Sequence, residues 1–210
     1  MFIDFLSNLL YALNMKVFSQ DNLAGVIKSL DKGDIIGVPT ETVYGLAVRA
    51  DNDEAIQKLL NLKHRNADSG KILSLMLPEV QHISRYAEFD GTARNVAQRF
   101  LPGELTIVLP KKYDFDHKYF DYFPTIGIRV PDHKYMLSLL NQVGALLVTS
   151  ANPKGEAPCL TSQELRERMP EVDGVVTGES GGNLPSTVID FSNPAKPEVL
   201  RQGGLLIVRY

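Results

Sequence analysis

Residues 34–46 read DIIGVPTETVYGL, a short apolar run followed at once by a polar turn. We expect the apolar run at 34–38 to form a buried strand that Pro39 terminates, because proline cannot donate a hydrogen bond to a sheet. The hydroxyls of Thr40 and Thr42 then crowd behind the end of a strand, where open α/β sheets bind their ligands. The alternative is an ordinary turn in which these hydroxyls satisfy only local backbone groups.

Outward from this segment, apolar patterns predict helices and strands that interleave along the chain. Helices are expected at about 21–30, 52–63, 92–99, 135–140 and 165–169. Strands are expected at 34–38, 72–77, 105–109, 127–130, 145–149, 175–176, 187–190 and 205–208. Several neighbouring strands lack the roughly twelve residues that a helical crossover needs. The sequence therefore predicts an α/β fold whose sheet mixes parallel and antiparallel strands.

The composition is that of one folded domain with ordinary charge. The chain has 210 residues, of which 44% are hydrophobic, and its formal net charge is -3. These values fit one well-filled core, and they argue against disorder and against nucleic-acid binding through bulk charge. Cys159 is the single cysteine, so no internal disulfide and no thiolate metal cluster can form. The histidines show no paired metal-ligand spacing, so we expect no structural zinc, and a reducing, cytoplasmic location is favoured.

The N-terminal stretch MFIDFLSNLLYALN is apolar at near-helical spacing. A secretory signal would need a basic start and an unbroken apolar run, whereas Asp4 comes early and Ser7 breaks the run. No stretch approaches the length of a membrane span, so we expect no membrane association. We predict a short amphipathic helix, or residues upstream of a start at Met15. The expected boundary separates an N-terminal extension at 1–15 from one folded domain at 16–210.

Basic residues follow the helix expected at 52–63. Lys63 and Arg65 flank His64 where that helix ends, and Ser69-Gly70-Lys71 comes shortly after. Arginine binds phosphate through a planar fork and lysine as a point charge, so the pair could hold a triphosphate or a leaving pyrophosphate. The alternative, favoured when this motif is taken alone, is that both cations complement the dipole at a helix C-terminus.

Further motifs place polar side chains in or beside strands. Arg129 interrupts the apolar strand GIRVP, so it either faces solvent or meets an anion such as an amino-acid carboxylate. Ser150 and Asn152 of SAN follow a strand and can donate to phosphate or ribose oxygens. Ser186 lies in PSTVID and Arg201 in LRQGG, where ordinary turn chemistry is the alternative. The sequence contains no P-loop, no G-x-G-x-x-G and no H-E-x-x-H motif.

The order of these motifs is more specific than any one of them. PTETVYGL, K-x-R, PGELT, GIRVP, SAN, PSTVID and LRQGG follow one another between about Gln20 and the C-terminus. In this order the chain closely resembles the YrdC family of threonylcarbamoyl-AMP synthases. The resemblance implies a single α/β domain, a twisted open mixed sheet with flanking helices around a deep, positively lined cavity. It also implies an enzyme that joins L-threonine and bicarbonate to AMP from ATP and releases pyrophosphate, for N6-threonylcarbamoyladenosine modification of tRNA.

The resemblance further implies which residues form the site. Thr42, Arg129 and Ser186 should contact threonine. Lys63 and Arg65 should serve catalysis, and the nucleotide and its phosphates should be bound by Lys63, Arg65, Ser69, Thr125, Ser150, Asn152 and Arg201. Mg²⁺ should accompany ATP without a dedicated protein site. The chain departs from the family pattern at Asn66, Ser69-Gly70-Lys71 and Ser74, so the differences gather near the expected ATP loop.

None of the motifs offers an obvious nucleophile or tuned base, so we expect catalysis by positioning and electrostatics. The implied partners are ATP, L-threonine and bicarbonate, with a tRNA threonylcarbamoyl-transfer complex downstream and tRNA or double-stranded RNA as further candidates. The rival hypothesis is a non-catalytic protein that binds double-stranded RNA, tRNA or an rRNA precursor. The acidic net charge and the scarcity of interleaved arginine and aromatic residues argue against that rival.

Overall fold

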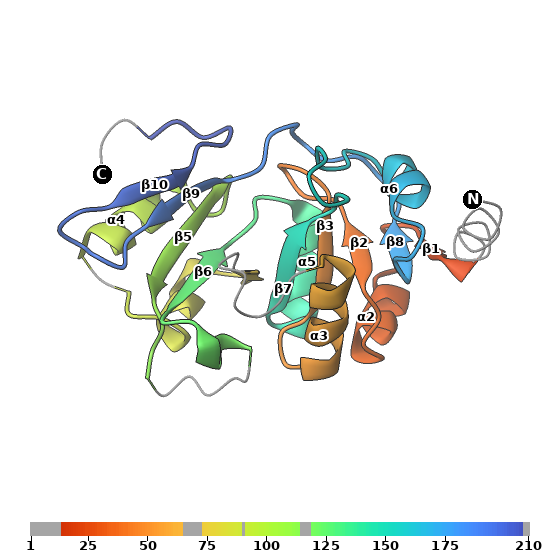
Figure 1. Ribbon diagram of the computed structural model, residues 1–210, viewed down its shortest axis with the longest axis horizontal. Helices are drawn as coiled ribbons and strands as arrows, with labels where there is room; N and C mark the ends of the chain where they lie inside the picture. Colours follow the sequence, from red (N-terminus) through yellow and green to blue (C-terminus); the bar gives the residue numbers. More distant parts are fainter. Residues whose placement is uncertain (1–13, 65–72, 90, 114–118, 208–210) are drawn as a thin grey trace.

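A computed structural model describes residues 14–64, 73–89, 91–113 and 119–207. Within these residues a ten-stranded sheet runs through the molecule in the order β1-β8-β2-β3-β7-β4-β6-β5-β9-β10. Figure 1 shows β1 and β10 at opposite ends of the molecule, near the two chain termini. The sheet is therefore open, with an edge strand at each end.

The strands are short, and most of their residues are buried. In chain order they are β1 (Lys16–Phe18), β2 (Ile36–Val38), β3 (Gly45–Arg49), β4 (Ser74–Met76), β5 (Leu105–Pro110), β6 (Thr125–Arg129), β7 (Leu146–Ser150), β8 (Gly174–Val176), β9 (Thr187–Asp190) and β10 (Glu198–Arg201). β8 runs parallel to β1 and β2, β4 to β6, and β5 to β9. The other neighbours are antiparallel. The mixed sheet predicted from strand spacing is confirmed.

Helices pack on both faces of the sheet. They are α2 (Leu23–Asp31), α3 (Asp53–Leu62), α4 (Gly91–Phe100), α5 (Lys134–Val143) and α6 (Ser162–Arg168), together with the 3-10 turns η1 (Val80–Arg85) and η2 (Phe120–Tyr122). Asn52 caps α3, because Asn52 Oδ1 accepts the Ala55 N–H at 3.0 Å. None of the helices among the described residues has the length and apolar character that crossing a bilayer requires.

Two buried clusters lie on opposite faces of the sheet. Ala47 of β3 joins the cluster beneath α2 and α5, whereas its neighbours Leu46 and Val48 join the cluster that contains residues of α3, α4 and α6. This division follows from the alternation of side chains along a strand. Each face of the central strands is therefore buried by helices, which explains their near-continuous apolar sequences.

The face that carries α2 and α5 is covered only in part. The cluster beneath these helices takes side chains from β1, β2, β3, β4, β7 and β8, but none from β5, β6 or β9. On the same face, Ser74 pairs with Val148 on one side and with Gly127 on the other. Residues paired across strands share a face, so small side chains lie where the helices end. This arrangement leaves a hollow over the middle of the sheet.

The structure corrects several sequence-based expectations. β1, β3 and β10 were not predicted, and the strand predicted at 205–208 does not form in its described part, 205–207. Instead, Leu205 O accepts hydrogen bonds from Thr187 Oγ1 and Gln202 Nε2, at 2.7 and 2.9 Å, so the chain folds back over β9. Residues 1–13 of the expected extension lie outside the described residues. Met15, assigned to that extension, is buried in the core.

The fold-back after β10 depends on a glycine. A Cβ on Gly203 would lie 2.0 Å from Pro185 O and 2.5 Å from Ser186 C, which are backbone atoms that cannot move away. We therefore expect Gly203→Ala to lower the free energy of unfolding by about 1–3 kcal/mol, the usual cost of overpacking. Chemical denaturation should measure this loss. In the control Gly127→Ala, the new Cβ would meet nothing closer than 3.6 Å and should cost less. Equal stabilities of the two variants would contradict this account.

Candidate active site

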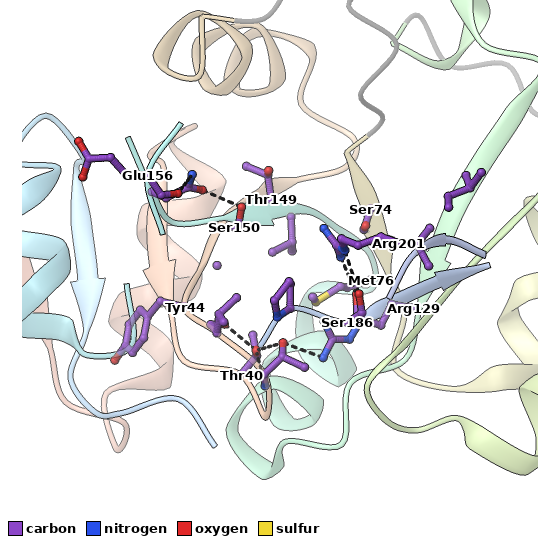
Figure 2. A pocket seen from close by; sticks show the side chains of 18 of the residues that line it. Thr40, Tyr44, Ser74, Met76, Arg129, Thr149, Ser150, Glu156, Ser186 and Arg201 are labelled. Atoms are coloured by element: carbon purple, nitrogen blue, oxygen red, sulfur yellow. Dashed lines mark hydrogen bonds between the residues drawn. The ribbon is translucent and has the colours of Figure 1, made fainter. Parts of the chain in front are cut away.

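A cavity of about 670 Å³ lies over the open part of the sheet. Its wall brings together residues that are far apart in the sequence: Thr40, Thr42, Arg129, Ser150, Asn152, Ser186 and Arg201. Figure 2 shows labelled members of this set converging on one space from separate strands and turns. Val148 and Val188 add apolar surface to the wall. A cavity with convergent polar groups on an apolar wall is the usual form of a small-molecule site.

The turn between β2 and β3 supplies one side of the cavity. Thr40 Oγ1 donates to Val43 O at 2.7 Å, accepts the Thr42 N–H at 3.1 Å and lies 2.9 Å from Thr42 Oγ1. Arg129 Nη2, at the end of β6, donates to Thr42 Oγ1 at 3.0 Å. Both threonines are almost fully buried. The turn hydroxyls therefore do satisfy local backbone groups, and they also form a network that ends at a cation.

Arg129 is buried, and its charge is balanced by Glu41. Arg129 Nη2 donates to Glu41 Oε1 at 2.7 Å, and the same oxygen accepts the Asp132 N–H at 2.9 Å. Arg129 Nε and Glu41 Oε2 are also buried, and neither has a hydrogen-bond partner among the described residues. A buried donor without a partner costs free energy. Arg129 lines the cavity, and one of its buried donors has no acceptor among the described residues.

A second network holds Ser186 and Arg201 together. Arg201 Nη2 donates to Ser186 Oγ at 3.1 Å, and Arg201 Nε donates to Ser186 O at 3.0 Å. Thr106 Oγ1, from β5, lies 2.8 Å from Ser186 Oγ. Burial of the guanidinium and the neighbouring charge of Arg129 lower the pKa of Arg201. Figure 2 draws Arg129, Arg201 and Ser186 close together at one end of the cavity.

Lys63 supports the part of the cavity wall that Ser150 and Asn152 form. It follows α3, it is buried, and its Nζ donates to Ser150 O at 3.1 Å and to Asn152 Oδ1 at 3.1 Å, as well as to Asn152 O. Ser150 Oγ in turn donates to Asn152 Oδ1 at 2.7 Å. Lys63 is not among the residues that line the cavity. Its ammonium therefore fixes the shape of the Ser150–Asn152 segment.

Tyr44 lines the cavity but is held by the fold. Its hydroxyl donates to Val176 O at 2.9 Å, and burial raises the pKa of the phenol. The Tyr44 phenol therefore stays neutral near pH 7, and the side chain forms part of the cavity wall.

The structure brings most of the expected site residues to one place. Thr42, Arg129, Ser150, Asn152, Ser186 and Arg201 all line the cavity, and Lys63 contacts it through the SAN segment. Thr125 does not line it, because it lies at the far end of β6, roughly 13 Å from Arg129 at about 3.3 Å per residue. Arg65 and Ser69 lie outside the described residues, so their roles stay predictions.

Two residues near the cavity, Glu41 and Thr106, had not been given a role from the sequence, and for Thr40 the sequence had not shown which groups it contacts. Glu41 and Thr40 sit within the PTET motif, and Thr106 closes the PGELT motif. Thr106 and Thr40 are buried polar residues, and each one contacts the hydroxyl of another cavity residue. Thr40 also lines the cavity, whereas Thr106 does not. Motif membership was the available signal, but only the fold shows which hydroxyl each residue contacts.

Comparisons with known proteins agree with this geometry. Residues 28–203 match a family model of the Sua5/YciO/YrdC domain, whose description is "Telomere recombination". A protein from Vibrio campbellii named threonylcarbamoyl-AMP synthase is 36% identical over 187 residues, which cover 87% of this chain and 99% of that protein. A rat protein of the same name is 32% identical over 86% of this chain, and the match spans 66% of its own length.

A solved structure extends the likeness to three dimensions. The structure of Sua5 from P. abyssi in complex with L-threonine has a TM-score of 0.80 and 27% sequence identity, over 91% of this chain and 58% of that one. The present chain thus spans nearly all of the Vibrio relative and about three fifths of the P. abyssi chain. The family model covers most of the chain and includes every described residue of the cavity network, so the chain belongs to the Sua5/YciO/YrdC family.

Proposed function

We propose that this chain is an L-threonylcarbamoyladenylate synthase, which forms threonylcarbamoyl-AMP and pyrophosphate from L-threonine, bicarbonate and ATP. The observation that carries the proposal is one cavity in which buried Arg129 faces hydroxyls while the SAN segment forms the other side. Such a cavity can hold an amino acid and a nucleotide next to each other. Relatives of similar length that bear this enzyme's name support the same reading.

The threonine subsite in this proposal is centred on Arg129. Arg129 lines the cavity, and its planar fork suits a carboxylate better than an ammonium group would. Thr42 and Ser186 lie within reach of the same guanidinium network and can contact the amine or the hydroxyl of threonine. The nucleotide would lie toward Ser150 and Asn152, whose polar atoms end β7 at the edge of the sheet.

Mg²⁺ would accompany ATP in this site. Oxygen is its preferred ligand, and nucleotide phosphates usually supply several of the ligands. The described cavity wall adds hydroxyls and the carboxylate of Glu156, which suit such an ion without enclosing it. The bound ion would neutralise phosphate charge.

In this proposal, the protein accelerates the reaction mainly by holding the substrates in the correct positions. The amine of threonine attacks the carbon of bicarbonate to give a carbamate and water, and a carbamate oxygen attacks the α-phosphorus in line. Holding the two substrates in one cavity is worth up to roughly 7–11 kcal/mol of the barrier. Arg201, with Arg65 as a further predicted cation, would stabilise charge on the phosphates.

The product would supply the N6-threonylcarbamoyladenosine modification of tRNA, through a separate transfer complex. We place this work in the cytoplasm, where a buried, unpaired Cys159 is compatible with reducing conditions. Direct contact of this chain with tRNA is a further proposal, which follows from the family resemblance.

The proposed reaction predicts strict substrate dependence. Purified protein should release pyrophosphate from ATP only when threonine and bicarbonate are both present, because the carbamate is the nucleophile. A coupled pyrophosphate assay with each substrate omitted in turn measures this. Tight binding of double-stranded RNA with no turnover would favour the RNA-binding rival instead.

Arg129→Lys tests the threonine subsite. Lysine keeps the charge but loses the fork, so the KM for threonine should rise by roughly 10–100-fold while the Kd for ATP changes by less than about twofold. Calorimetric titration of each ligand into both proteins measures the two effects separately. Unchanged threonine binding with a collapse of ATP binding would make Arg129 a phosphate ligand.

Lys63→Met tests whether Lys63 supports the SAN segment. Its loss leaves the carbonyls of Ser150 and Asn152 without their buried donor, so the free energy of unfolding should fall by about 1–3 kcal/mol and ATP affinity should fall with it. The control is Lys58→Met, which removes an exposed ion pair with Asp173 and should cost about 0–1 kcal/mol. Full stability with abolished turnover would mean that Lys63 acts directly on phosphate.

A further inference from the structure

The hydrogen bonds of the PTET turn determine where two protons lie. A threonine hydroxyl has one proton to donate and two lone pairs that accept. Thr40 Oγ1 donates its proton to Val43 O, because a carbonyl can only accept. Thr40 therefore has no proton left for Thr42. In the 2.9 Å contact between the two hydroxyls, Thr42 must be the donor and Thr40 the acceptor.

The same count fixes what Thr42 can offer to a ligand. Its proton is committed to Thr40, and one of its lone pairs accepts the Arg129 Nη2–H at 3.0 Å. One lone pair remains on Thr42 Oγ1, and Thr42 is one of the residues that line the cavity. Thr40, for its part, is saturated by the Thr42 hydroxyl, the Thr42 N–H and Val43 O. Figure 2 shows the dashed chain of bonds that joins Thr40 to Arg129.

We propose that Thr40 is a positioning residue, which fixes the Thr42 hydroxyl as an acceptor for the α-amine of the amino-acid substrate. This inference rests on the function proposed above. Arg129 attracts the carboxylate, and the adjacent lone pair of Thr42 receives an N–H from the same molecule. Because the chain of donors starts at a guanidinium and ends at a carbonyl, each bond polarises the next and the direction is held.

The direction of this chain matters for the reaction. In R–NH₂ + HCO₃⁻ → R–NH–COO⁻ + H₂O, the nitrogen lone pair forms the N–C bond, and a hydroxyl leaves bicarbonate with an amine proton as water. An acceptor beside the amine binds an N–H and leaves the lone pair free to attack. A donor at the same place would bind the lone pair and block the attack. Thr40 therefore keeps Thr42 from acting as such a donor.

Two analogues test the polarity in the wild-type protein. 2-Aminobutyrate and 2-oxobutyrate differ at one carbon. The first compound carries an amine there, which can donate a hydrogen bond, and the second carries a carbonyl, which can only accept one. Measured as inhibitors of threonine-dependent pyrophosphate release, the amine should bind at least about tenfold more tightly, because the carbonyl would oppose the Thr42 lone pair. Equal inhibition by the two compounds would overturn the assignment of Thr42 as an acceptor.

Thr40→Val and Thr40→Ser test the origin of that polarity. Valine keeps the shape of threonine but frees the Thr42 proton, so the preference for the amine should shrink several-fold and the threonine KM should rise about tenfold, with the Kd of ATP unchanged. Serine keeps the hydroxyl and should restore both values to within about twofold of wild type. Thr106→Val, which removes a buried hydroxyl from the other network, should leave the amine preference intact.

The outcomes separate this inference from the proposed function. If wild-type protein releases no pyrophosphate with threonine, the proposed function fails and the inference fails with it. If the wild type is active and Thr40→Val keeps the full amine preference, the inference alone fails. Thermal melting shows whether the valine variant is folded. If it is not, the wild-type comparison of analogues still decides whether Thr42 is an acceptor.

Discussion

A guanidinium enclosed in a sheet must have partners, and much of this site follows from how Arg129 finds them. Its strand pairs with β4 and β5, so the side chain rises into the space beside the sheet rather than into bulk water. Glu41 supplies a counter-charge and Thr42 a neutral acceptor. Both belong to the turn after β2, which is therefore drawn against the end of β6. One buried charge thus connects two distant parts of the chain.

The cavity exists because helix coverage and side-chain size change at the same place. Beneath α2 and α5 the sheet face carries large apolar residues such as Leu146 and Ile36. Beyond them, Ser74 and Gly127 occupy adjacent places in the register, and no helix of the described chain buries this part of the face. Larger side chains here would fill the hollow that the ligands need. The cavity therefore lies where the cover of α2 and α5 stops, and the small side chains of this part of the sheet leave space above it.

Features that depend on a local sequence signal could be predicted from the sequence, whereas contacts between residues far apart in the chain could not. β9 has the predicted bounds, because an apolar run after a polar turn is a local signal. β1, β3 and β10 were missed, because strands of three to five residues are too short to show a clear periodicity. The motif order predicted the cavity hydroxyls and Arg129. The contact of Lys63 with the β7 carbonyl of Ser150 could not be predicted, since a helix end gives no sign of a partner 87 residues away, and the role of Lys63 toward phosphate stays a prediction. Thr125 was expected at the site from the family resemblance, although three residues of strand lie between it and Arg129.

The two hydrogen-bond networks of the cavity contain the same kinds of groups, but the direction of the bond between the two hydroxyls differs. In each, a guanidinium donates to a hydroxyl that is backed by a buried threonine: Arg129 to Thr42 with Thr40 behind it, and Arg201 to Ser186 with Thr106 behind it. Thr40 passes its proton to a carbonyl and so must accept from Thr42.

Thr106 differs from Thr40, because its hydroxyl has no other hydrogen-bond partner among the described residues. Donating to Ser186 is the arrangement that leaves no buried O–H unpaired, and buried polar groups are rarely left unpaired. Ser186 then accepts from both Thr106 and Arg201 and keeps its own proton for the cavity. One hydroxyl of the site thus accepts and the other donates. An amino acid, with a donating amine beside an accepting carboxylate, is complementary to that pair.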